Sequence, residues 1–145
     1  MMDKLAYPDG VYQYIYKVCY FHSINIFTAF YYGQKFCGLL GMLLCFTSFN
    51  YWRYPLITSK RRIVDMVVAN TSIPYHIYLS FSTKNKLLCS GLLITGSSMY
   101  PISIVINDKY KNYELAALCH CLLHLFIITG VSFTYRDYYL HNTIQ

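Results

Sequence analysis

The pattern with the greatest capacity for chemistry is the segment Cys119-His-Cys-Leu-Leu-His124, which lies within a long apolar stretch. His120 and His124 are four positions apart, so on a helix both imidazoles lie on one face and can bind one metal ion. Ionisable side chains are costly inside a membrane and mark functional sites there. The pair predicts a metal site, with zinc as the only expected cofactor. The alternative is that both histidines are neutral and form hydrogen bonds to neighbouring helices.

Two more histidines lie at a similar depth along their own segments. At the helical rise of 1.5 Å per residue, His120 and His124 are about 10 and 16 Å from the inner end of theirs. By the same arithmetic His22 is about 15 Å deep and His76 about 20 Å deep. All four share one slab of a bilayer. We therefore expect the third metal ligand to be His76 or, if the first segment spans the membrane, His22.

Ser48 and Asp65 are the candidate catalytic residues, because they flank a basic loop close to the same level. Ser48 is about 6 Å, and Asp65 about 3 to 4 Å, from the inner end of its segment. Each has a structural alternative. The Ser48 hydroxyl can bond to a carbonyl one turn back. Asp65 can pair with Arg61 and Arg62 near a helix N-terminus, where negative charge is favoured.

The composition limits the classes of protein to which the chain can belong. It has 145 residues, of which 56% are hydrophobic and 12% charged, and its net charge is +6. Soluble domains carry about 25% charged residues. A soluble enzyme, a disordered tail and a nucleic-acid-binding module are thereby excluded, so we expect no nucleic-acid partner. The chain is predicted to be an integral membrane protein with a single domain over residues 1–145.

Charge-free runs predict the elements that position these residues. A membrane-spanning helix needs about 20 mostly apolar residues. The fold class expected is therefore all-α, a polytopic bundle of about five antiparallel spans joined by short loops. The weakest, residues 11–32, either spans or lies in the interface, which would leave four spans. The five expected segments are Val11–Tyr32, Phe36–Trp52, Ile63–Thr83, Leu87–Asn107 and Tyr113–Tyr135.

Basic residues predict the orientation. The loop Arg53–Arg62 contains four basic residues and no acidic one, so we expect it to face the cytoplasm. With five spans, the N-terminus and the loop Asp108–Lys111 lie on that same side, and the C-terminus lies opposite.

Polar and small residues near two prolines predict how the spans pack. Pro74 and Pro101 each leave a carbonyl without its helical donor, so the neighbouring polar residues are expected to face inward. These polar residues are Asn70, Thr71, Ser72, Thr95, Ser97 and Ser98. Close contacts between helices are expected at the small residues Gly38, Gly41, Gly91 and Gly96.

The order Ser48, Asp65 and His120-x-x-x-His124, spread over successive helices, resembles the alkaline ceramidase and progestin–adipoQ receptor superfamily of membrane hydrolases. The string from His120 to Gly130 is similar to the closing helix of ceramidases. The resemblance implies a zinc ion held by His120, His124 and a third histidine, with Ser48 and Asp65 beside it and water attacking a lipid amide. The family's third histidine follows the serine by four residues, and here that position is Trp52.

The sequence favours two functions. Catalytic zinc normally has three protein ligands, and that set is incomplete here. We therefore expect a structural or interaction component of a membrane, whose partners are the lipid bilayer and a membrane protein. The alternative is a zinc-dependent lipid amide or ester hydrolase with a lipid substrate. A haem protein ligated by facing histidines and a transporter with proline-broken spans are further alternatives.

Overall fold

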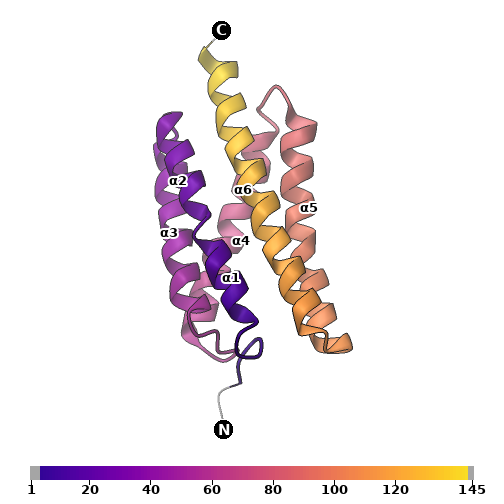
Figure 1. The fold of residues 1–145 in the computed structure, drawn as a ribbon. Coiled ribbons are helices and arrows are strands. Elements are labelled where there is room, and N and C mark those ends of the chain that lie inside the picture. Colours follow the sequence, from indigo (N-terminus) through magenta and orange to yellow (C-terminus); the bar gives the residue numbers. More distant parts are fainter. Residues whose placement is uncertain (1–3, 144–145) are drawn as a thin grey trace.

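The computed structural model describes residues 4–143, and the elements in this part of the chain are all helices, as the sequence predicts (Figure 1). The single extended pairing within these residues is an isolated bridge between Leu5 and Leu56. The elements are α1 (Tyr12–Cys19), α2 (His22–Tyr31), α3 (Lys35–Trp52), α4 (Lys60–Ser80), α5 (Lys86–Val105), the π-helical turn η1 (Ile106–Tyr110) and α6 (Tyr113–Thr143).

Short connections make neighbouring helices antiparallel. The N-terminal end, the α3–α4 connection and the α5–α6 connection lie at one end of the molecule, and the C-terminus lies at the other (Figure 1). Two backbone hydrogen bonds fasten the N-terminal segment to the α3–α4 connection, from Ala6 N to Pro55 O and from Ile57 N to Lys4 O. The side chain of Ser59 caps α4 by accepting from Arg62 N, which satisfies one free donor at the helix start.

Residues 11–32, which the sequence predicts as one segment, form two helices instead. The chain turns at Tyr20 and Phe21, whose amides bond three residues back, to Lys17 O and Val18 O. Both short helices pack on α6, and both also contact α3. The break allows α1 and α2 each to pack on α6.

Helix α6 is the central element and continues to Thr143, well past the expected end at Tyr135. It packs most extensively on α5, and two glycines permit this contact. A Cβ atom at Gly96 would lie 3.0 Å from Phe126, and one at Gly130 would lie 3.0 Å from Leu93. Gly91, expected at a helix contact, instead has no described atom within 4 Å of its Cβ position.

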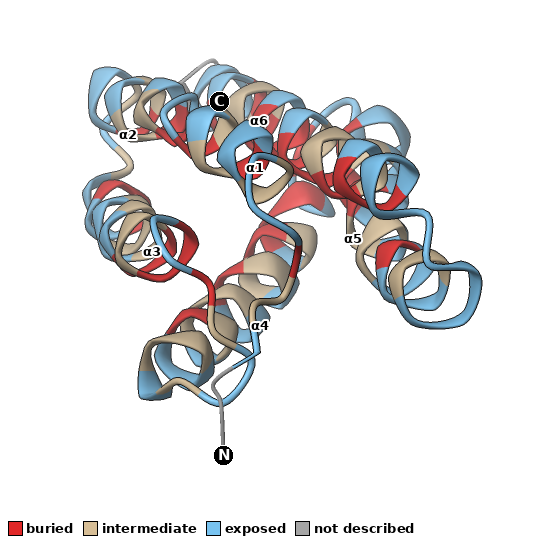
Figure 2. Ribbon diagram, turned by 60° about the horizontal axis from the view of Figure 1, so that its bottom comes forward, coloured by how far each residue is buried: buried red, intermediate tan, exposed pale blue. Residues whose placement is uncertain are grey.

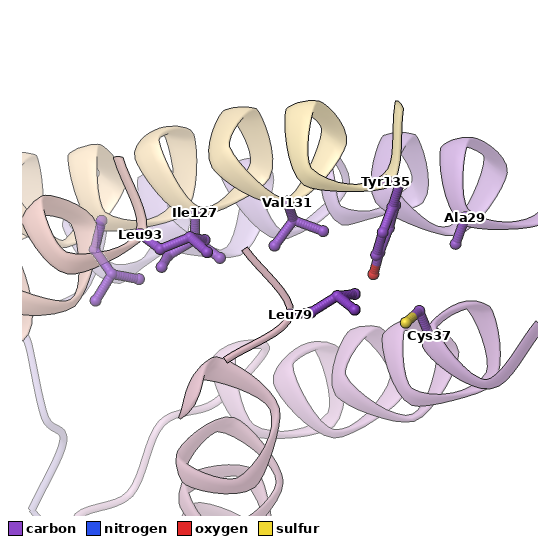
Figure 3. Close-up of a cluster of buried hydrophobic side chains, with 8 residues drawn as sticks. Ala29, Cys37, Leu79, Leu93, Ile127, Val131 and Tyr135 are labelled. Atoms are coloured by element: carbon purple, nitrogen blue, oxygen red, sulfur yellow. The ribbon is translucent and has the colours of Figure 1, made fainter. Parts of the chain in front are cut away.

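The largest apolar cluster joins α2, α3, α4, α5 and α6 in the half of the molecule nearer the C-terminus. Tyr135 projects from α6 toward the space between Leu79 and Cys37 (Figure 3). A second cluster, around Ile15, Trp52 and Ala116, lies toward the opposite end.

Each long helix has a buried face turned toward the other helices and an exposed face turned outward (Figure 2). Polar as well as apolar side chains are buried, and many large apolar side chains are exposed. His22, Asp65 and His124 are buried, while Phe27 on α2 is 74% exposed and Leu87 on α5 is 85% exposed. Every long helix presents apolar residues outward, including Phe46, Val67, Ile94 and Leu118.

Two helical segments are long and apolar enough to cross a membrane, Lys86–Tyr110 and Tyr113–Asn142, among the residues that the structure describes. The helices at residues 12–31, 35–52 and 60–80 do not meet that standard.

The polar residues near the prolines face inward only in part. Ser72 is buried, but Thr71 and Ser98 are exposed and bond to carbonyls of their own helices, Val67 O and Thr95 O.

Candidate ligand-binding pocket

The helices enclose a pocket of about 460 Å3 between α3, α4, α5 and α6. Four of the residues predicted from the sequence line it: Ser48, Asp65, His120 and His124. These residues come from three helices. The two that are farthest apart in the sequence, Ser48 and His124, are separated by 76 positions. We call this space the main pocket. Its volume lies within the range of about 300–1,000 Å3 that is usual for ligand sites.

Ser48 and Asp65 are held together by a direct hydrogen bond. Ser48 Oγ donates to Asp65 Oδ1 over 2.7 Å, and Thr47 Oγ1 donates to the same oxygen over 3.1 Å. The Ser48 hydroxyl therefore bonds to the carboxylate rather than to a carbonyl one turn back. All three side chains are buried.

Asp65 has no ion pair with the arginines that precede it in the sequence. Arg61 donates to Asn50 O and Tyr54 O, and Arg62 donates to Ile57 O. Within residues 4–143 the one salt bridge joins Arg136 to Asp137. The structural role expected for Asp65, pairing with Arg61 or Arg62, is thus not what the structure shows.

Three histidines form a cluster on the wall of the main pocket. His22 Nε2 lies 2.9 Å from His124 Nδ1, and the ring centroids of His120 and His124 are 5.1 Å apart. His22 and His124 are 4% and 6% exposed. His124 Nε2 is buried and has no hydrogen-bond partner among the described residues. An unpaired buried polar atom of this kind costs about 1–3 kcal/mol, so a ligand that bonds to it would bind favourably.

His76 does not join this cluster. Its Nδ1 lies 2.7 Å from Ser72 O, and its Nε2 lies 2.6 Å from Tyr135 Oη. Both ring nitrogens are therefore engaged. His76 lines a separate cavity of about 20 Å3, which we call the small cavity, and His22 lines both spaces. Of the two candidates for a third ligand, the structure brings His22 and not His76 to the helix pair.

The residues present do not assemble a zinc site as they stand. Imidazoles are suitable zinc ligands, and three are neighbours here. However, no three histidine, cysteine, aspartate or glutamate side chains in the described part of the chain are placed to hold one ion. His22 and His124 direct nitrogens at each other, as a hydrogen bond requires. We therefore derive no chemical step through a metal.

Aromatic residues complete the pocket wall, and no motif in the sequence marked them as part of a site. Trp52, at the position of the family's histidine, contacts His120 with 4.7 Å between ring centroids, and Tyr100 contacts His120 from α5. Tyr7 reaches the pocket from the N-terminal segment, and its ring is tilted against that of Trp52 with the centroids 6.0 Å apart. Burial raises the pKa of Tyr7 to about 12.

No protein family matches this chain, and neither curated proteins nor solved structures are significantly similar to it. The fold and the pocket define its class: over the described residues it is an all-helical protein with a largely apolar pocket, into whose wall a few histidine, aspartate and serine side chains are set.

Proposed function

We propose that the chain is a multi-pass integral membrane protein. The burial pattern supports this proposal, because large apolar side chains lie on the outside of every long helix while four histidines and the carboxylate of Asp65 lie inside. Soluble monomers rarely expose apolar patches larger than a few hundred Å2. Hydrocarbon favours the observed distribution, since ionisable residues in a membrane face the bundle interior.

The same proposal extends to five antiparallel spans and to a cytoplasmic end formed by the N-terminus and the loop Arg53–Arg62. The mean hydropathy of helices α3 and α4 is lower than that of a typical membrane-spanning helix. Their polar residues Thr47, Ser48 and Asp65 are buried in the interior, however. Their lipid-facing surfaces are therefore more apolar than their averages. Single cysteines introduced into the loops, labelled from each side of sealed vesicles, test the arrangement. Labelling of residues 53–59 and residues 82–84 from the same side would contradict it.

Within the membrane, we propose that the main pocket binds an amphiphilic lipid. The observation that carries this function is the pocket itself, which combines an apolar lining with a few polar groups, including the unpaired His124 Nε2. Ligand sites have this composition. A purely structural component needs no such space, so this proposal departs from the structural role favoured by the sequence.

A pair of variants on one helix tests lipid binding. Ala69 lines the main pocket, and Val67, two residues earlier on α4, is 60% exposed. Ala69→Trp fills the pocket, whereas Val67→Trp adds the same bulk on the outside. Native mass spectrometry of protein extracted in mild detergent should show a bound lipid in wild type and in Val67→Trp, but not in Ala69→Trp. Equal lipid content in all three proteins would refute the pocket as the site.

A second candidate function is hydrolysis of a lipid amide or ester. The observation that favours it is the Ser48–Asp65 hydrogen bond beside His120 and His124, because the resemblance to alkaline ceramidases implies these same residues. Elemental analysis of the purified protein tests it. Zinc near one equivalent that is lost in the variant His120→Ala/His124→Ala supports the hydrolase. Metal-free wild-type protein that turns over no lipid amide or ester refutes it.

A further inference from the structure

We infer that the end of the main pocket nearest the α3–α4 connection is a head-group site for a zwitterionic phospholipid with a primary ammonium group. Arg62 binds the phosphate, and Asn107 and Asp108 bind the ammonium. All three residues line the main pocket. The inference rests on the proposed lipid binding and names the class of lipid that the pocket takes.

Charged residues lie toward one end of the main pocket and apolar residues toward the other. Arg62 lies at the start of α4, and Asp108 lies in η1, which follows α5 at the same end of the molecule (Figure 1). Ile77, also in the lining, is about 22 Å further along α4 at 1.5 Å per residue. A phospholipid whose head group lies near the membrane surface has the same order of polar and apolar parts.

Asn107 presents an acceptor that no described residue satisfies. Its Nδ2 donates to Asp108 Oδ1 over 2.9 Å, and since a carboxylate only accepts, this contact fixes the orientation of the amide. Asn107 Oδ1 is buried and has no hydrogen-bond partner within residues 4–143. An unpaired buried acceptor is costly, so a ligand that supplies a donor is favoured. A primary ammonium has three N–H donors, whereas a trimethylammonium has none.

Carboxylates and tyrosines near Asn107 favour a cation. Asp65 and Asp108 both line the main pocket, and neither forms a salt bridge with a described residue. Tyr7 and Tyr100 belong to the same wall, and the Tyr7 phenol interacts electrostatically with Asp108 and Tyr100. Aromatic ring faces attract ammonium groups, as carboxylates do. The ligand is therefore expected to place its positive charge at this end of the pocket.

Arg62 supplies the positive charge that a phosphate requires. Its Nη1 donates to Ile57 O, and the guanidinium has five donors in all, so further donors are left for a phosphate. The Tyr51 phenol interacts electrostatically with both Arg62 and Tyr7. Since Tyr7 interacts in turn with Asp108, the cation and the carboxylate face the same part of the pocket. One zwitterionic head group can therefore contact both.

The main pocket reaches the surface between α4 and α5, which gives the acyl chains a way into the bilayer. Asn70 and Pro74 on α4 and Ile104 on α5 line the pocket and are exposed. A volume of about 460 Å3 suits a ligand of drug size. The head group and the adjoining part of the lipid are thus expected inside the pocket, with the chains extending outward between the two helices.

Lipid binding to the purified full chain tests the head group. Delipidated protein in mild detergent receives phosphatidylethanolamine, phosphatidylcholine or phosphatidylglycerol with identical acyl chains, and native mass spectrometry measures the bound fraction. Phosphatidylethanolamine should bind about tenfold more tightly than the other two, because phosphatidylcholine lacks the N–H donors and phosphatidylglycerol lacks the cation. O-phosphoethanolamine, the head group without acyl chains, should compete only weakly.

Variants of neighbouring residues locate the site. Arg62→Gln and Asn107→Leu should each lower the affinity for phosphatidylethanolamine about tenfold, and Asn107→Leu should also remove the preference over phosphatidylcholine. Arg61→Gln is the matched control. Arg61 donates to Asn50 O and Tyr54 O and does not line the pocket, so this variant should bind as wild type does. Circular dichroism and size-exclusion chromatography establish folding, and the comparison of lipids on wild type is decisive even if a variant does not fold.

The possible failures are distinguishable. Equal binding of the three lipids to wild type, or unchanged binding by folded Arg62→Gln and Asn107→Leu, would overturn the head-group site and leave lipid binding standing. Lipid binding by Ala69→Trp equal to that of wild type would refute the lipid pocket and this inference with it. Competition by O-phosphoethanolamine as strong as that of the whole lipid would show that the ligand is a soluble phosphate compound and overturn the membrane lipid.

Discussion

His22 Nε2 and His124 Nδ1 lie 2.9 Å apart although 102 positions separate the two residues in the chain. This contact fastens the second helix to the centre of α6 and brings a third imidazole to the wall of the main pocket. Since both rings are buried, each satisfies a polar atom of the other. The pair is therefore both a structural contact and the core of the candidate site.

The His22–His124 contact predicts non-additive effects on stability. His22→Leu leaves both His124 nitrogens unpaired, and it should lower the free energy of unfolding by about 1–3 kcal/mol. The double variant His22→Leu/His124→Leu removes both polar groups, so it should cost less than the sum of the single variants by about 0.5–3 kcal/mol. Unfolding in mixed micelles at increasing SDS measures all three. Strict additivity would show that the rings do not interact.

Ser48 is predicted to stabilise the buried carboxylate of Asp65. Ser48→Ala removes the 2.7 Å hydrogen bond and leaves Thr47 as the remaining hydroxyl donor, which should cost about 1–3 kcal/mol in the same unfolding experiment. The further change Asp65→Leu should recover part of the loss, because it removes the carboxylate that had lost its partner. If Ser48→Ala unfolds like wild type, the bond contributes nothing.

Glycines on α5 and α6 offer a matched test of helix packing. Gly130→Leu forces side-chain atoms into Leu92 and Leu93, where even a Cβ would lie 3.0–3.1 Å from them. We expect a loss of about 1–3 kcal/mol, the usual effect of overpacking. Gly91→Leu on α5 places the same side chain where no described atom lies within 4 Å, and it should change stability by less than about 0.5 kcal/mol. The reverse order of effects would contradict this packing of α5 on α6.

The buried phenol of Tyr7 is expected to make the folded protein less stable in alkali. Burial raises the pKa of this phenol from 10.0 to about 12. Between these values the unfolded chain releases the proton while the folded chain retains it, so the free energy of unfolding falls as the pH rises. Below pH 10 both states are protonated and the group contributes no slope.

Tyr7→Phe should remove this part of the alkaline decline. Thermal unfolding at about pH 9 and about pH 11 compares it with wild type and with Tyr14→Phe, a change at a tyrosine that is 62% exposed. Tyr14→Phe should decline as wild type does. An equal decline in Tyr7→Phe would mean that Tyr7 does not keep its proton in the folded state.

Part of the candidate site could be predicted from the sequence because a helix has a fixed rise. The rise placed His120, His124 and His22 at a common depth, and it placed Ser48 and Asp65 near one another across a short loop. The rise says nothing about rotation around the helix axis. His76 has a similar depth, yet its ring faces Ser72 and Tyr135. The choice between His22 and His76 therefore required the structure.

The amino-acid sequence by itself determined that the chain is helical and where most helices begin, to within a few residues, because apolar runs and short polar gaps are local properties. It also determined that ionisable residues lie within apolar segments. Only the tertiary structure decided that residues 11–32 break into two helices, that Asp65 pairs with hydroxyls rather than with arginines, and that two cavities meet at His22. These features depend on the relative rotation of packed helices, which the side chains of distant segments fix together and no local pattern specifies.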